Sequence, residues 1–80
     1  MKVYAIFNHG GLLHERTNLR LAKDEAKRLS ADYIIEYDVL VTLHVQKITI
    51  LNYYLYASRI GRFITYKPDE FERCRRFLSL

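Results

Sequence analysis

Residues 33–45, YIIEYDVLVTLHV, decide how this chain folds. The even positions of the stretch are mostly polar, with Ile34 and Leu40 as exceptions. The odd positions are all apolar or aromatic: Tyr33, Ile35, Tyr37, Val39, Val41, Leu43 and Val45. Alternation with a period of two places the odd side chains on one face of a β-strand. We therefore predict one long strand over 33–45, with its odd face buried, its register firmly specified and the rest of the chain packed against it.

The segment before this strand predicts a hairpin. Residues 2–8 would carry apolar side chains on both faces of a strand, which is typical of a strand inside a sheet. Gly10 and Gly11 follow as a turn, because glycine adopts positive φ without steric cost. Residues 12–17 then return as an antiparallel strand.

A helix is predicted over residues 19–30. Thr17 or Asn18 can cap its N-terminus. Leu21 falls off the apolar stripe, so either the helix starts nearer Ala22 and Leu21 belongs to the preceding strand, which we favour, or Leu21 touches a partner. The stripe itself has helical spacing and consists of Leu19, Ala22, Ala26 and Leu29.

Beyond residue 45 the phase of the apolar pattern changes, because Ile48 and Ile50 occupy even positions. Such a change predicts a bulge, bend or turn near Gln46 and Lys47. The segment is followed by residues 51–57, which are rich in Tyr and Leu.

We predict strands over 51–57 and 62–66, joined by a turn at 58–61, on the basis of β-propensity. The competing interpretation is a helix over 49–60 that ends at Gly61. Pro68, followed by two acidic residues, then starts a C-terminal helix over 69–79.

These elements predict an α+β fold: a small antiparallel sheet of four to five strands, one helix packed on a face, and the C-terminal helix at an edge or end of the sheet. The 80 residues form a single domain, 1–80. Seven Tyr and four Phe supply an ample core.

Cys74 is the only cysteine, which excludes an intrachain disulfide and a multi-cysteine zinc site and fits a reducing compartment. The N-terminus lacks the pattern of a signal peptide, and no apolar run is long enough to span a membrane. We therefore expect a cytoplasmic protein without membrane association.

The net charge of +4 is uneven. Residues 58–80 hold six basic and three acidic side chains, whereas residues 1–57 are nearly balanced. A basic C-terminal third favours an acidic macromolecular partner, with a protein preferred over nucleic acid. The alternative is a solvated charged surface that aids solubility.

No spacing in the chain is diagnostic of catalysis, and we expect neither an enzyme nor a bound cofactor or metal. An alternative is a small nuclease or toxin that uses Glu36, Asp38 and His44, because carboxylates and imidazoles can bind a divalent metal or transfer protons. Even positions of a half-exposed strand are, however, normally polar.

Aromatic and basic residues are interleaved in the C-terminal half. Such a mixture is typical both of protein-binding hot spots and of nucleic-acid surfaces, where aromatics stack bases and cations meet phosphates. The alternative is that half of these tyrosines are core residues. The predicted binding residues are Tyr53, Tyr54, Tyr56, Arg59 and Arg62, with a second basic patch of Arg73, Arg75 and Arg76.

An opening hairpin, a helix carrying AKDEAKRL at residues 22–29, and antiparallel strands after it resemble in layout many small phage-encoded accessory proteins, anti-CRISPR proteins among them. This resemblance covers residues 1–57 and implies a stoichiometric inhibitor of a host machine. The function we expect is non-enzymatic binding that occupies a macromolecular partner, with a nucleic-acid-binding module as the alternative. A homodimer stays open, because an exposed edge strand is a ready pairing surface.

Overall fold

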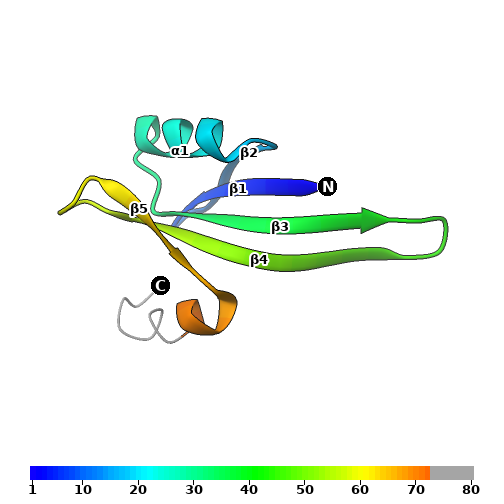
Figure 1. Ribbon diagram of the computed structural model, residues 1–80. Helices are drawn as coiled ribbons and strands as arrows, with labels where there is room; N and C mark the ends of the chain where they lie inside the picture. Colours follow the sequence, from blue (N-terminus) through cyan, green and yellow to red (C-terminus); the bar gives the residue numbers. More distant parts are fainter. Residues whose placement is uncertain (73–80) are drawn as a thin grey trace.

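A five-stranded antiparallel sheet carries one helix on one of its faces (Figure 1). The computed structural model describes residues 1–72. Across the sheet the strands run in the order β2-β1-β3-β4-β5. The elements are β1 (Lys2–Asn8), β2 (Gly11–Arg16), α1 (Leu19–Arg28), β3 (Tyr33–Val41), β4 (Gln46–Ala57) and β5 (Arg62–Tyr66).

The predicted α+β fold is confirmed, as are the opening hairpin, the turn at 58–61 and the strand over 62–66. The competing helix over 49–60 is wrong, because these residues belong mainly to β4. Residues 68–72 are helical, so the C-terminal helix begins at Pro68. The remainder of the predicted helix 69–79 lies outside the described residues.

The long strand predicted over 33–45 is wrong at its C-terminal end, because β3 stops at Val41. The chain reverses through Leu43 and His44. Thr42 closes the turn: its backbone N–H donates to the carbonyl oxygen of Val45 at 2.8 Å, and its Oγ1 accepts the backbone N–H of Val45 at 3.0 Å. The Thr42 hydroxyl thus supports a turn that contains neither glycine nor asparagine, the usual turn residues.

The change of phase after residue 45 is a consequence of this reversal. Across a two-residue turn, odd positions of β3 pair with even positions of β4, as Val39 does with Ile48 and Tyr37 with Ile50. Directly opposed residues share a face of the sheet. The true bulge lies further along, at Leu51, where the register between β3 and β4 shifts.

The helix covers the even face of β3, not the odd face that we predicted to be the buried one. Ile34, an apparent exception in the pattern, is fully buried beneath α1 in the core. Glu36 is also buried, at 4% exposure, because neighbouring side chains satisfy its carboxylate. The core consists of Tyr4, Ile6, Ala22, Ala26, Ala31, Ile34 and Tyr54.

Helix α1 lies close against the sheet because Ala22 and Ala26, two of its three buried residues, have small side chains. Asn18 caps it: Oδ1 accepts the backbone N–H of Leu21 at 3.1 Å. The favoured placement of Leu21 in the preceding strand is wrong, since the helix begins at Leu19 and Leu21 is an exposed helical residue.

The odd face of β3 forms the second, open face of the sheet. Part of this face is covered by Phe71 of the helical segment 68–72, and the Phe71 side chain is buried. The Phe71 ring stacks on Tyr53, with centroids 3.9 Å apart, and lies 5.9 Å from the ring of Tyr33. Aromatic packing thus fixes the C-terminal segment on the face that α1 leaves uncovered.

Candidate binding surfaces

The three tyrosines predicted as one binding surface lie in three different environments. Successive strand residues point to opposite faces, so Tyr53 faces the open side, while Tyr54 and Tyr56 face the helix side. Tyr53 stacks on Phe71. Tyr54 is only 6% exposed and is a core residue, which corrects its assignment to a binding surface. Of the three, only Tyr56 is exposed.

Tyr54 belongs to a buried polar network around Glu36. The Tyr54 hydroxyl donates to Oε1 of Glu36 at 2.5 Å, and Nδ2 of Asn52 donates to the same oxygen at 3.0 Å. Nζ of Lys2 lies 3.6 Å from the other carboxylate oxygen. Burial by itself raises the pKa of Glu36, but these bonds and the Lys2 charge outweigh it and hold the pKa below its usual range.

The same contacts act in the opposite direction on the phenol. Burial, together with the neighbouring Glu36 carboxylate, raises the pKa of Tyr54 well above its usual value. The network therefore holds a charged carboxylate and a neutral phenol inside the fold, which is a structural role.

Arg59 and Arg62 are exposed at the β4–β5 turn, as a binding role requires. Arg62 opens β5, and Arg59 lies in the turn itself. The second predicted patch, Arg73, Arg75 and Arg76, lies outside the described residues.

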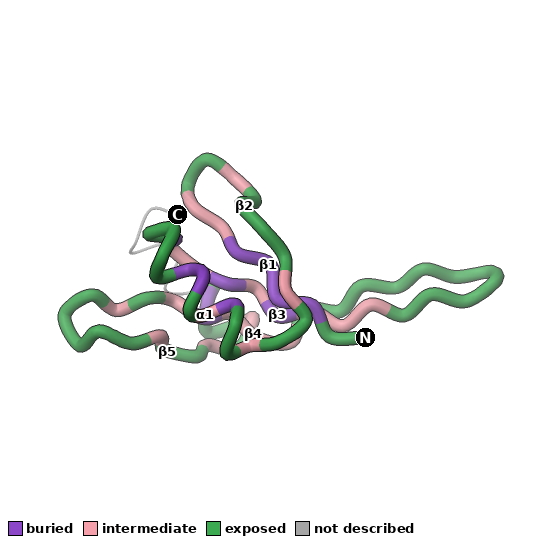
Figure 2. The backbone as a smooth tube through the Cα atoms, turned by 90° about the horizontal axis from the view of Figure 1, so that it is seen from above, coloured by how far each residue is buried: buried purple, intermediate pink, exposed green. Residues whose placement is uncertain are grey.

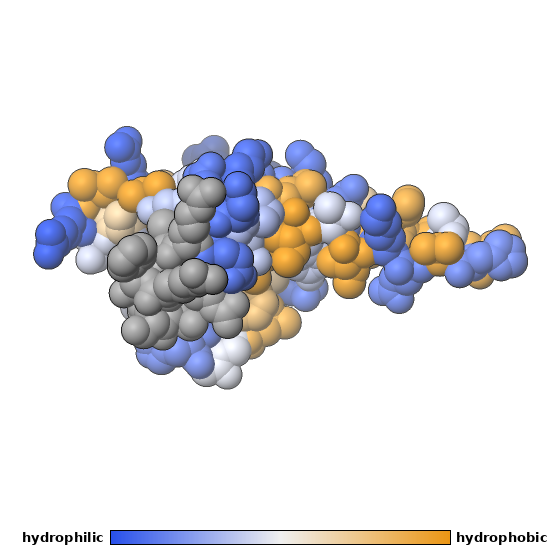
Figure 3. All heavy atoms as spheres, turned by 90° about the horizontal axis from the view of Figure 1, so that it is seen from below, coloured by the Kyte–Doolittle hydropathy of each residue, from blue (hydrophilic) through white to orange (hydrophobic). Residues whose placement is uncertain are grey.

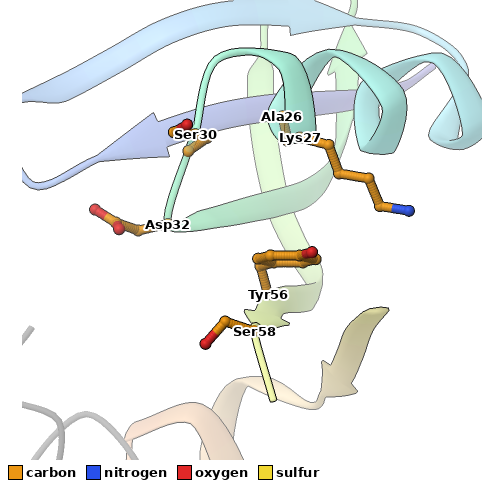
Figure 4. A pocket seen from close by; sticks show the side chains of 7 residues that line it. Ala26, Lys27, Ser30, Asp32, Tyr56 and Ser58 are labelled. Atoms are coloured by element: carbon orange, nitrogen blue, oxygen red, sulfur yellow. The ribbon is translucent and has the colours of Figure 1, made fainter. Parts of the chain in front are cut away.

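Basic and aromatic side chains of α1, β4 and β5 lie at and beside a hollow between α1 and the end of β4. Tyr56 and Phe63 form a tilted pair with ring centroids 5.1 Å apart. Lys23 Nζ lies 5.4 Å from the centroid of the Tyr54 ring, and Lys27 borders a hollow of about 360 Å³ beside Tyr56 (Figure 4). We call Lys23, Lys27, Tyr56 and Phe63 the basic groove; of these, Lys27 and Tyr56 line the hollow itself, together with Asp32. Of the predicted binding residues described here, only Tyr56 belongs to it.

A second polar cluster joins β2 to α1. Glu25 of α1 is buried, and its carboxylate accepts from Nδ1 of His14 and from Nε of Arg16, the latter at 2.5 Å. The hydrogen bond with His14 and the Arg16 guanidinium outweigh burial and lower the pKa of Glu25. This cluster attaches the edge strand to the helix.

The most unusual surface is the end of the β3–β4 hairpin, residues 40–50, which we call the arm. It projects beyond the other strands, and every residue in it is exposed (Figures 1 and 2). Lys47 is its only formally charged residue, His44 being counted as neutral. Six large apolar side chains on it are 42–98% exposed: Leu40, Val41, Leu43, Val45, Ile48 and Ile50.

Seen from below the sheet, apolar side chains recur along the arm as well as over the body (Figure 3). Val41, Ile48 and Ile50 share the open face of the sheet, whereas Leu40 lies on the other face. Exposed apolar side chains gathered on one face are typical of an interaction site. Sequence reasoning missed the arm, although one signal was available: between residues 39 and 51 there is a single lysine and no carboxylate.

The residues of the alternative catalytic site do not come together. Glu36 is engaged in its buried network, and Asp38 binds the N-terminal ammonium at 2.9 Å. His44 lies in the turn of the arm, about 20 Å further along at 3.3 Å per residue. Within residues 1–72, no group of three His, Cys, Asp or Glu side chains is arranged to hold a metal ion.

Comparison of the chain with protein families, curated proteins and solved structures finds no match. Of the helices in residues 1–72, none has the length and apolar character needed to cross a membrane.

Proposed function

We propose that the protein is a non-enzymatic binding protein that acts by occupying a macromolecular partner, and that the arm makes the contact. The observation that carries this proposal is the exposure of six large apolar side chains on an element with one charge. The resemblance in layout to phage-encoded accessory proteins extends it to a stoichiometric inhibitor of a host machine. The single cysteine favours a reducing compartment such as the cytoplasm.

The arm has little packing of its own to stabilise it in water. A two-stranded ribbon is marginally stable by itself, and this one has neither a third strand nor a helix over residues 40–50 within the described part of the chain. A partner that covers the ribbon removes its apolar side chains from water. Each Å² of apolar surface buried in this way contributes about 25 cal/mol of favourable free energy. Binding therefore supplies the packing that the fold does not.

The chemistry of the arm favours a protein with an apolar cleft over nucleic acid. Affinity for nucleic acid comes largely from several lysines or arginines that neutralise phosphates. The arm offers only Lys47 for that purpose. Its Leu, Ile and Val side chains instead match the apolar centre of a protein interface.

The test is capture from nuclease-treated host extract with three tagged proteins: the wild type, Leu43→Asp and Arg59→Glu. Leu43 is 98% exposed, so its replacement leaves the fold intact. We expect the wild type and Arg59→Glu to retain one protein in fixed ratio above about 0.3 M salt, where binding dominated by phosphate contacts is lost. Leu43→Asp should retain none. Equal capture by Leu43→Asp contradicts the assignment to the arm.

A second candidate function, binding of single-stranded nucleic acid, is favoured by the basic groove. Tyr56 and Phe63 offer rings for base stacking, and Lys23 and Lys27 offer charge for phosphates. This function predicts that Lys23→Glu with Lys27→Glu abolishes retention of a labelled oligonucleotide, whereas Leu43→Asp leaves it unchanged. If the charge-reversed groove binds the oligonucleotide as well as the wild type does, this candidate is wrong.

A further inference from the structure

The outer edge of β4 is open along the arm. Strand β5 pairs with Tyr53–Ala57 only, so it leaves Gln46–Asn52 without a neighbour on that side in the part of the chain that the structure describes. Figure 1 shows β5 diverging from β4 towards the helical segment 68–72, while β4 continues into the arm. The open stretch ends at the turn on one side and at the start of β5 pairing on the other.

The hydrogen-bonding direction of this edge follows from β3. The Val39 N–H donates outward, away from β4, to the Met1 carbonyl at 2.8 Å. In an antiparallel ladder the residue opposite an outward-facing residue also faces outward, and the direction alternates along the strand. Ile48 lies opposite Val39, so Gln46, Ile48 and Ile50 turn their N–H and C=O groups to the open edge.

Little protects this edge from pairing. Natural edge strands are guarded by proline, by charged side chains or by bulges. Between Gln46 and Ile50 there is no proline and only Lys47 is charged. The bulge at Leu51 lies beyond this stretch, so the register of Gln46–Ile50 with β3 is unbroken.

We infer that a second copy of the chain pairs with this edge, antiparallel and about a two-fold axis beside Ile48. The regular stretch Gln46–Ile50 has Ile48 at its centre. A two-fold axis beside Ile48 therefore pairs every residue of this stretch with a residue of the same stretch in the second copy. Its outward N–H and C=O groups then face identical groups that run in the opposite direction. The pairing joins the two sheets into one.

The side chains of the two copies are compatible in this register. Ile48 lies across from Ile48 of the second copy and Gln46 across from Ile50, all on the open face. Lys47 lies across from Thr49 of the second copy on the other face. No carboxylate of the arm is left opposite an apolar residue, because the arm has none.

The experiment is sedimentation equilibrium of the purified full-length protein, with no other protein present, from micromolar to millimolar concentration. The expected result is a species of twice the 9.6 kDa mass of one chain. Ile48→Pro removes an outward N–H while keeping every N–H that faces β3, and it should raise the dissociation constant at least 100-fold. Ile48→Thr, which keeps the N–H and the β-branch, should stay within about tenfold of the wild type.

Hydrogen exchange of the wild-type amides gives a reading that does not depend on how the proline variant folds. The Ile48 and Ile50 amides should become protected as concentration rises, whereas the Val41 amide, on the outer edge of β3, should not. A mass of 9.6 kDa at every concentration overturns the inference, as does an Ile48→Pro variant that folds and still dimerises. Neither measurement involves the partner of the proposed function, so each proposal can fail without the other.

Discussion

Removal of the Tyr54 hydroxyl tests the buried network that connects β3 and β4. In Tyr54→Phe the ring still fills its place in the core, but Glu36 loses the donor that lies 2.5 Å from Oε1. A hydrogen bond to a charged group contributes about 1.5–3 kcal/mol to the free energy of unfolding. We expect a loss of about 2 kcal/mol, which lowers the melting temperature by roughly 8–16 °C in a domain of this size.

The loss should depend on pH in a direction set by Glu36. Because its pKa is lowered in the fold, its contribution to stability is fully present above the unfolded value near 4.5 and is lost as the pH falls through the lower folded value. Without the Tyr54 bond the folded pKa rises. The difference between the two proteins should therefore be greatest near neutral pH and should narrow below pH 4.5.

Urea unfolding followed by circular dichroism, at pH 7 and pH 3, measures both effects. Tyr56→Phe is the matched control, since Tyr56 lies on the same strand and face but is exposed. It should change the free energy of unfolding by less than about 0.5 kcal/mol, as surface substitutions do. Equal losses in the two variants, or a loss for Tyr54→Phe that is the same at both pH values, would show that the Tyr54 hydroxyl does not stabilise the ionised Glu36 carboxylate.

Three further substitutions test separate parts of the fold. Asn18→Ala removes the cap of α1 and should cost about 1 kcal/mol in urea unfolding, which Asn18→Ser should largely restore; no change means that the cap is not needed. Phe71→Ala should cost about 3–5 kcal/mol, because the ring is buried against Tyr53; a surface-like loss below 0.5 kcal/mol means that the segment 68–72 does not pack there in solution. Thr42→Val removes the oxygen that accepts the Val45 N–H and should speed exchange of arm amides but not of β1 amides; unchanged arm exchange contradicts the role given to this hydroxyl.

Period-two alternation predicted β3 as far as Val41, and β-propensity predicted the strands over 51–57 and 62–66. The period-two pattern failed at residues 42–45 for a physical reason. The alternation runs on through Val45 and its phase changes only from Ile48, so the turn was predicted near Gln46 and Lys47 instead of at Leu43 and His44, where the Thr42 hydroxyl closes it. The pattern therefore signalled a reversal but not its position.

The choice of buried face also lay beyond the sequence pattern. Both faces of β3 carry apolar residues, and α1 covers the face with Ile34 because Glu36 beside it is satisfied by Tyr54 and Asn52. These partners are 16 and 18 residues away in sequence, so their convergence depends on the register of β3 with β4. Burial of a carboxylate follows from tertiary contacts and not from local propensity.

For the candidate site, the sequence pattern could assign each tyrosine to a face of the sheet but not to the core or the surface. The same alternation that defines a strand places Tyr53 on the opposite face from Tyr54 and Tyr56, so they could not form one surface. Which of them is buried depends on where α1 and Phe71 lie. The arm, in contrast, was accessible from composition, since uncharged apolar residues fill a stretch that no other predicted element covers.

A photo-crosslinking amino acid at position 43 is the sharpest probe of the arm as the contact surface, compared with the same group at position 59, both in living cells. We expect one discrete protein adduct from position 43 and none from position 59. A band at twice the mass of the chain would report the second copy, and it can be distinguished by size. Adducts from position 59 alone, or adducts that nuclease removes, would contradict the account.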